Sequence, residues 1–344
     1  MKYVAIGLFF CCLMSIQVGA QDKVVSRKQF FTDTAMVVVT LQTDLKKLQA
    51  KRKNPSFQPG TITWHNADST GDVTGNIKVR LRGNFRRENC GIASLMVEFR
   101  DSTNKSRLNN LKNLKLVAPC FRGYENEQLV IKEFLVYKIY NQITDKSFKV
   151  RLMQVTFEDV NDKMKPYTQY AFAIEPIDDL AKRNECVEED ERQVLTEETN
   201  RSHTTIVNIF QYMIGNTDFG IPVYHNIKLM VPLNDTTAAP YVIPYDFDYA
   251  GLVNAPYAVP HEITGLTAVT ERKYMGFPRT WEEIKAAATV FKTQKEEILN
   301  IVNTFPYLGN ISRKEMLGYL DDFYYFLNNE NQVKGEFINR ARTQ

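Results

Sequence analysis

Short segments rich in strand-favouring residues occupy most of the first half of this chain, and turn residues separate them. β-Branched and aromatic residues favour extended backbone, whereas Gly, Asn and Asp favour turns. The strand-like segments are 35–41, 77–81, 94–99, 114–117, 150–157 and 170–175. This succession predicts a predominantly antiparallel sheet.

Two stretches, one in each half of the chain, have the spacing of helices. Residues 127–143 and 204–214 mix apolar and polar side chains with a helical period. In a capping box, a hydroxyl and a carboxylate satisfy the free N–H groups at a helix start. Two further helix starts carry this pattern, with Pro306 separating their helices: Thr280 with Glu283, and Ser312 with Glu315.

Residues 184–200 are polar and contain an acidic run, which indicates a solvated loop or a boundary between two lobes. A strand pair is expected beyond it, at 224–231 and 241–248, around the turn Asn234–Asp235. The sequence therefore predicts an α+β protein with a β-rich front, a helical back and a polar joint.

The N-terminus has the order of a secretory signal peptide. Lys2 precedes an apolar run from Tyr3 to Ile16, and the small residues Val18, Gly19 and Ala20 follow. The run has about 14 residues, and a membrane span needs about 20, so cleavage is favoured over anchoring. We expect residues 1–20 to be removed and the mature protein to be secreted or periplasmic.

Charge and cysteine content limit the classes of partner. Removing residues 1–20 takes away one Lys and no acidic residue, so the net charge of +3 becomes +2. Nucleic-acid binding would need clustered basic residues, and the sequence shows no such cluster. The mean hydropathy of −0.33 and the lack of a later long apolar run indicate no stable membrane insertion. Cys90, Cys120 and Cys186 remain after cleavage; one bridge plus a free thiol, or three thiols, both fit.

Three Asp residues and one Asn, in a set order along the chain, are the candidates for catalysis and metal binding. Asp218, Asn226, Asp246 and Asp248 flank the expected helix, loop and strand pair. Phosphoryl transfer needs an Asp that orients the acceptor hydroxyl, and Asn and Asp oxygens that hold divalent cations on the phosphates. We therefore expect Asp218 to be the catalytic base and Asn226 and Asp246 to be metal ligands. Asp248 is expected to be an additional metal ligand or a residue that contacts one of the ligands. Ordinary strand-end aspartates or a structural calcium site are the alternatives.

In this order of motifs the chain resembles the spore-coat CotH kinase-like family, which consists of atypical secreted relatives of protein kinases. The matching elements are Val79–Asn84 (R-x-RGN), 94–101, 114–118 with the helix from Glu127, Tyr170–Asp178, Asn216 with Asp218, Asn226, and Pro244–Asp248. The resemblance implies a two-lobed protein-kinase-like fold, with a β-rich lobe at 21–178 and a mainly helical lobe at 179–344.

The implied activity is a metal-dependent transfer of the γ-phosphate of ATP to Ser or Thr hydroxyls of an exported protein, with Mg²⁺ or Mn²⁺. Lys115 is the candidate phosphate-contacting lysine, with Glu133 as an ion-pair partner, and Glu175 matches the Glu that precedes the second lobe. Arg80 and Arg82 fit phosphate contact or a solvated strand face equally.

Two departures favour a catalytically inactive binding or scaffold protein in surface or coat assembly. The interval from Asp218 to Asn226 is longer than in kinases, and 90–93 lacks the lysine-rich approach of the family. A surface adhesion protein with a calcium-stiffened turn at Asp246 and Asp248 is a third alternative. His225 and His261 lack paired metal-ligand spacing, and the sequence does not indicate an oligomeric state.

Overall fold

The computed structural model describes residues 27–65, 71–91, 94–100 and 111–342. The expected signal peptide at 1–20 lies outside these ranges, so cleavage and export stay predictions. Within these ranges, no helix combines the length and the apolar character needed to cross a bilayer.

Seven strands form a closed barrel in the first half of the chain. Their order around the barrel is β1-β2-β3-β4-β5-β7-β6, and β1 pairs with β6 to close it. That closing pair is parallel, with Leu41 opposite Phe157, and the other six pairs are antiparallel. The strands are β1 (Val37–Thr43), β2 (Gln58–His65), β3 (Val73–Leu81), β4 (Leu95–Phe99), β5 (Asn113–Val117), β6 (Val150–Asp159) and β7 (Tyr167–Ile174).

The barrel contradicts the expected two-lobed kinase-like fold with a β-sheet N-terminal lobe. The strand-like segments and their mostly antiparallel pairing were predicted correctly, but β2 was missed and the closure was not foreseen. Residue alternation fixes which face of a strand is buried, whereas closure depends on pairing between β1 and β6, which are far apart in sequence. Closing the sheet leaves no unpaired edge.

The barrel interior is an apolar cluster of inward-facing side chains. Two short helices, α1 (Arg27–Thr32) and α2 (Leu45–Ala50), add buried side chains to it, Phe30 and Leu48 among them. Each fully buried aliphatic or Phe side chain contributes about 1.5 to 3 kcal/mol. The interior strand residues include Val39, Leu41, Ile62, Ile77, Val79, Leu95, Val97, Leu114, Leu116, Val155 and Phe157.

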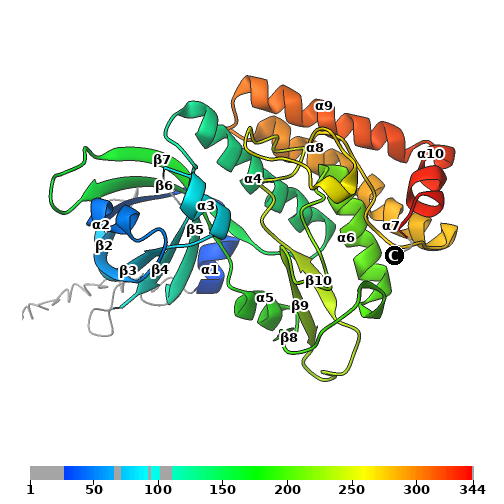
Figure 1. The fold of residues 1–344 in the computed structure, drawn as a ribbon, viewed down its shortest axis with the longest axis horizontal. Coiled ribbons are helices and arrows are strands. Elements are labelled where there is room, and N and C mark those ends of the chain that lie inside the picture. The colour runs from blue at the N-terminus through cyan, green and yellow to red at the C-terminus, as the bar shows by residue number, and fades with distance from the viewer. Residues whose placement is uncertain (1–26, 66–70, 92–93, 101–110, 343–344) are drawn as a thin grey trace, which may run out of the picture.

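The helix α4 (Tyr124–Ile143) lies between the barrel and the other helices (Figure 1). It is buried on nearly all sides, and its apolar residues share one core with Phe172 of the barrel and Phe210 of a later helix. The helical part comprises α5 (Ile177–Arg183), α6 (Arg201–Ile214), α7 (Trp281–Thr293), α8 (Lys295–Thr304), α9 (Asn310–Leu327) and α10 (Glu330–Lys334).

A small antiparallel sheet lies below these helices in Figure 1. Its order is β10-β9-β8, with β8 at Cys186–Glu189, β9 at Ile227–Pro232 and β10 at Tyr241–Pro244. The expected strand pair is confirmed as β9 and β10. The polar segment 184–200 is not only a loop, because β8 pairs with β9 and Glu188 forms an ion pair with Lys228.

The two expected capping boxes have different outcomes. Thr280 and Glu283 form one at the start of α7, as expected. The second prediction was wrong, because α9 already begins at Asn310 and Ser312 is buried within its first turn. The single helix expected after Thr280 is divided into α7 and α8.

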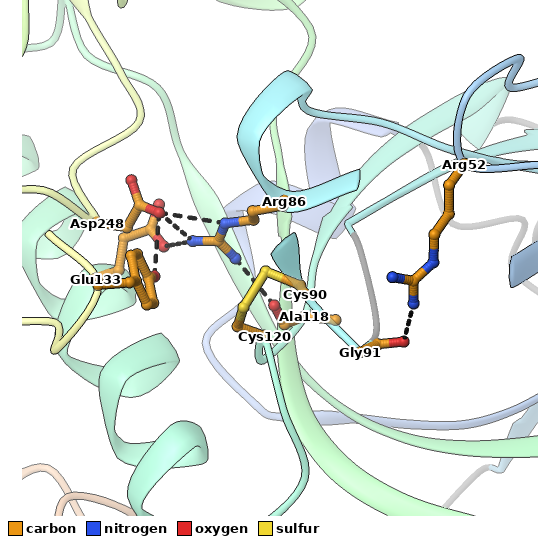
Figure 2. The surroundings of a disulfide bond; sticks show 9 residues. Arg52, Arg86, Cys90, Gly91, Ala118, Cys120, Glu133 and Asp248 are labelled. Carbon is orange, nitrogen blue, oxygen red and sulfur yellow. Dashed lines mark hydrogen bonds and ion pairs between the residues drawn. A yellow bond between two sulfur atoms is a disulfide. The ribbon is translucent and has the colours of Figure 1, made fainter. Parts of the chain in front are cut away.

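Of the two cysteine alternatives, the structure has one bridge and one thiol. Cys90 and Cys120 form a disulfide across 30 residues, whereas Cys186 is a buried free thiol. The bridge joins the end of the short helix α3 (Asn84–Asn89) to the segment after β5 (Figure 2). In the loop-entropy model, closing such a loop stabilises the fold by about 3.5 kcal/mol.

Replacing Leu41 tests the closed barrel. Leu41 is fully buried between β2 and β6, so Leu41→Ala should lower the free energy of unfolding by about 2 to 5 kcal/mol. Gln42→Ala, at the exposed neighbouring position, should change it by less than about 0.5 kcal/mol. Urea unfolding measures both, and equal effects would contradict an inward-facing Leu41.

A second prediction concerns pH. His203 is buried in α6, its Nε2 lies 2.9 Å from the carbonyl oxygen of Val242, and burial lowers its pKa from 6.5 to about 4. The buried, neutral His203 therefore supports the folded state fully above pH 6.5, and this stabilisation is lost as the pH falls toward 4. From pH 7.5 to 5, it should lower the free energy of unfolding by about 2 kcal/mol. His203→Gln should remove that part of the pH dependence. Urea unfolding at each pH measures it, and the same change of unfolding free energy with pH in wild type and variant would refute the prediction.

Candidate functional site

The end of α6 positions the first site residue. Gly215 ends the helix in the left-handed region, at φ 65°, and buried Asn216 follows it. The Asn216 side chain accepts a hydrogen bond from the Asp218 backbone N–H at 3.0 Å and donates one to Gln211 Oε1 at 3.0 Å. Asn216 therefore fixes the backbone of Asp218 to the helix.

A backbone hydrogen bond between two glycines joins the segments that carry Asp218 and Asp248. The Gly251 N–H donates to the Gly215 carbonyl oxygen at 3.1 Å. A Cβ at Gly215 would lie 2.0 Å from the Tyr319 hydroxyl of α9, and one at Gly251 would lie 2.6 Å from it. A Cβ would clash at either position, and the hydrogen bond between the two glycines places Asp218 and Asp248 on segments in direct backbone contact.

The loop after Asp218 returns the chain to it. An isolated bridge between Gly220 and His225 closes this loop, which accommodates the long interval to Asn226. Asn226 Nδ2 donates to the carbonyl oxygen and to Oδ2 of Asp218, both at 2.9 Å. His225 Nε2 lies 2.7 Å from Asp218 Oδ1. The Asp218 carboxylate is thereby oriented on both oxygens.

Asp246 and Asp248 follow β10. Asp246 has a left-handed backbone with φ 65°, and its N–H donates to the Tyr137 hydroxyl oxygen at 2.9 Å. Between them, Phe247 is fully buried, with its ring centroid 4.7 Å from that of Tyr137. Burying Phe247 against α4 therefore places both aspartates on the opposite side of the segment, toward the barrel.

These residues line one cleft of about 510 Å³ between the barrel and the helical part. The structure thus brings together Asp218, Asn226, Asp246 and Asp248. Barrel-side residues and neighbours complete the lining: Arg82, Gly83, Arg86, Ser94, Val117, His225, Tyr245 and Tyr249. A larger hollow of about 640 Å³ lies along α9, but it contains none of the expected site residues.

Asp246 is the carboxylate that stays open to a ligand. Among the described residues, no hydrogen bond or ion pair reaches its side chain, which is half-buried. Burial, and then the charge of Asp248, raise the pKa of Asp246 to about 6, while Arg86 and Arg82 oppose the rise. A cation that binds here would relieve this unfavourable charge.

Asp248 is buried and already has partners. Arg86 donates to its Oδ2 from Nη2 at 3.0 Å and from Nε at 3.3 Å, and the Tyr257 hydroxyl donates to the same oxygen at 3.1 Å. Arg86 also donates to Glu133 Oε2 at 2.9 Å and to the carbonyl oxygen of Ala118 at 2.9 Å (Figure 2).

Burial governs the charges of this cluster. Burial alone would lower the pKa of Arg86, but Asp248 and Glu133 outweigh it and raise that pKa. Burial raises the pKa of Glu133 to about 8, against the opposing charge of Arg86, and among described residues its Oε1 has no hydrogen-bond partner. Sequence reasoning missed Arg86, although it lies just after the R-x-RGN element and four residues before Cys90.

Lys115 and Glu175 do not line the cleft. Lys115 lies on β5 opposite Met96, whose partner on β3 is Arg80, and its pKa is lowered to about 8 by burial and by the charges of Arg82 and Lys228. Glu133 pairs with Arg86, and among the described ion pairs none joins it to Lys115. Glu175 binds Arg183 at 3.0 Å and the Lys149 N–H at 2.9 Å, which connects β7 to α5.

The oxygen donors of the cleft fit a divalent cation that also binds phosphate. In the described part of the chain, no group of three His, Cys, Asp or Glu residues could hold a metal by itself. Mg²⁺ usually takes one or two protein carboxylates, with phosphate oxygens and water completing its shell. Two oxygen donors are suitable, the carboxylate of Asp246 and Oδ1 of Asn226. The amide nitrogen of Asn226 is directed to Asp218, which leaves its oxygen for a cation.

No family model matches this chain, and the search of curated proteins found no match. A function for this chain can therefore be proposed only from the residues of the cleft and their order in the chain.

Replacing Arg86 tests the buried cluster. Arg86→Ala leaves Glu133 and Asp248 buried without their cation, which should lower the free energy of unfolding by about 3 to 5 kcal/mol. Arg80→Ala is the matched control, because Arg80 lies over the Phe57 ring at the barrel surface and should cost about 0.5 to 1 kcal/mol. Equal losses in urea unfolding would show that the cluster does not stabilise the fold.

Proposed function

We propose that the cleft binds ATP with Mg²⁺ or Mn²⁺ and transfers the γ-phosphate to Ser or Thr hydroxyls of an exported protein. The observation that carries this proposal is the meeting of Asp218, Asn226 and Asp246 in one cleft, opposite the barrel cation Arg82. Phosphoryl transfer depends mainly on positioning and charge compensation, and these residue types supply both.

In this proposal Asp218 orients the acceptor hydroxyl and accepts its proton. Its carboxylate is directed by His225 at 2.7 Å and by Asn226 at 2.9 Å, so it does not need to reorganise when the acceptor binds. A positioned base of this kind contributes about 10²- to 10⁴-fold to a rate.

Asp246 and Asn226 would hold the cation. When bound, the cation neutralises negative charge on the phosphates and on the departing diphosphate. Arg82 lines the same cleft, has no ion pair among the described residues, and supplies positive charge to the phosphates from the barrel side. Lys115 lies outside the cleft lining, on β5, in line with Met96 and Arg80 across the barrel strands.

We further propose that the chain is a relative of the CotH kinase-like proteins and works outside the cytoplasm. The ordered motifs support the first point, although the closed barrel is not part of the fold that the resemblance implied. The N-terminal pattern and the Cys90–Cys120 disulfide support the second, because disulfides persist mainly in oxidising compartments.

A binding protein without turnover is the second candidate. It is favoured by the contacts of Asp248, which Arg86 and Tyr257 already occupy, so that fewer carboxylates are open to cations than the sequence indicated. Such a protein would bind nucleotide and cation without transferring phosphate.

Radiolabelled ATP distinguishes the two. The chain without residues 1–20 is incubated with [γ-³²P]ATP, Mn²⁺ and casein as a Ser/Thr acceptor, and label on casein and on the chain itself is counted. Asp218→Asn and Asp246→Asn should each lower transfer by at least about 100-fold. The matched control is Asp235→Asn, in an exposed turn away from the cleft, which should stay within about twofold.

Absence of transfer by the wild-type chain, together with a rise in melting temperature on adding ATP and Mn²⁺, would select the binding protein. Absence of both effects would reject both candidates.

A further inference from the structure

One guanidinium of the cleft lining pairs with two buried carboxylates. Arg86 comes from α3 on the barrel side, and its two acidic partners are Glu133 of α4 and Asp248 after β10 (Figure 2). Arg86 and both partner side chains are at least nine-tenths buried. The guanidinium thus neutralises carboxylates from two separate segments of the helical part.

Its contacts distinguish Asp248 from Asp246. Asp248 Oδ2 accepts three hydrogen bonds, two from Arg86 and one from Tyr257. No described residue contributes a hydrogen bond or ion pair to the side chain of Asp246. A divalent cation on Asp248 would lie against a fixed positive charge in a poorly solvated place, where repulsion is strong.

Arg86 is held in this position from two sides. Its Nη1 donates to the carbonyl oxygen of Ala118, and the helix that carries it ends at Cys90. Cys90 is bonded to Cys120, two residues beyond Ala118. The disulfide and the carbonyl contact therefore fix α3 and the guanidinium to the same short segment, which prevents Arg86 from moving aside for a cation.

We propose that Arg86 is a positioning residue that holds Asp248 and takes the place of a second divalent cation, so that the cleft binds a single divalent cation at Asp246 and Asn226. This inference rests on the proposed function, since it concerns the same cation site. In this arrangement Asp248 is held by Arg86 and does not bind the metal, and Asp246 and Asn226 coordinate it.

Equilibrium dialysis counts the cations. The chain without residues 1–20 is dialysed against Mn²⁺ with ATP and against Mn²⁺ alone, and the excess Mn²⁺ on the protein side is measured per chain. Wild type should hold one Mn²⁺ with ATP. Asp246→Asn should weaken Mn²⁺ binding at least tenfold, whereas Asp248→Asn, which still accepts from Arg86, should weaken it less than threefold.

Substitutions of Arg86 complete the test. Arg86→Gln removes the charge and should raise the count to two Mn²⁺ per chain, while Arg86→Lys keeps the charge and should leave it at one. A purely structural role would not separate these two variants by their cation count. If Arg86→Gln does not fold, the comparison of Asp246→Asn with Asp248→Asn still decides.

Two Mn²⁺ on the wild-type chain, or equal losses for Asp246→Asn and Asp248→Asn, would overturn the inference. No Mn²⁺ at all would overturn both this inference and the proposed function. One Mn²⁺ with the expected variant pattern, but no phosphate transfer, would support the single-cation site and reject the transferase.

Discussion

The buried ion cluster of Arg86 with Glu133 and Asp248 joins the two parts of this protein. A buried charge is costly unless its partners satisfy it, so the barrel, α4 and the segment after β10 must meet in one arrangement. Arg86 and Asp248 also line the cleft, so their ion pair links its barrel wall to its helical wall. Stability and site geometry therefore depend on the same contact.

Much of the local structure could be predicted from the sequence. Residue patterns identified six of the seven barrel strands, α4, α6 and the β9–β10 pair, and the capping box at Thr280 is present. Strand closure could not be predicted, because parallel pairing of β1 with β6 is decided by packing across the whole barrel. The acidic run hid β8, in which Glu188 forms an ion pair with Lys228 of β9 and Glu189 forms one with Arg192.

The Asp and Asn residues of the site could be predicted from the sequence, but the buried Arg86 could not. Asp218, Asn226 and Asp246 stand in an order that indicates phosphate chemistry, and they share one cleft, while their roles stay predictions. Arg86 is one of many basic residues, and its partners are 47 and 162 residues away. Burial of a charge depends on such distant partners, so no local pattern distinguished it from a surface arginine.

The contact of Gly215 and Gly251 around the Tyr319 hydroxyl has a consequence for natural variation. The segments that carry Asp218 and Asp248 meet through main-chain atoms of Gly215 and Gly251, next to a helix that contributes no side chain to the cleft. A methyl group at Gly215 would clash with the Tyr319 hydroxyl of α9, and one at Gly251 would clash with that hydroxyl and with the carbonyl oxygen of Val269. A larger residue at Gly215 would therefore require a smaller residue at position 319, in a helix that does not line the cleft.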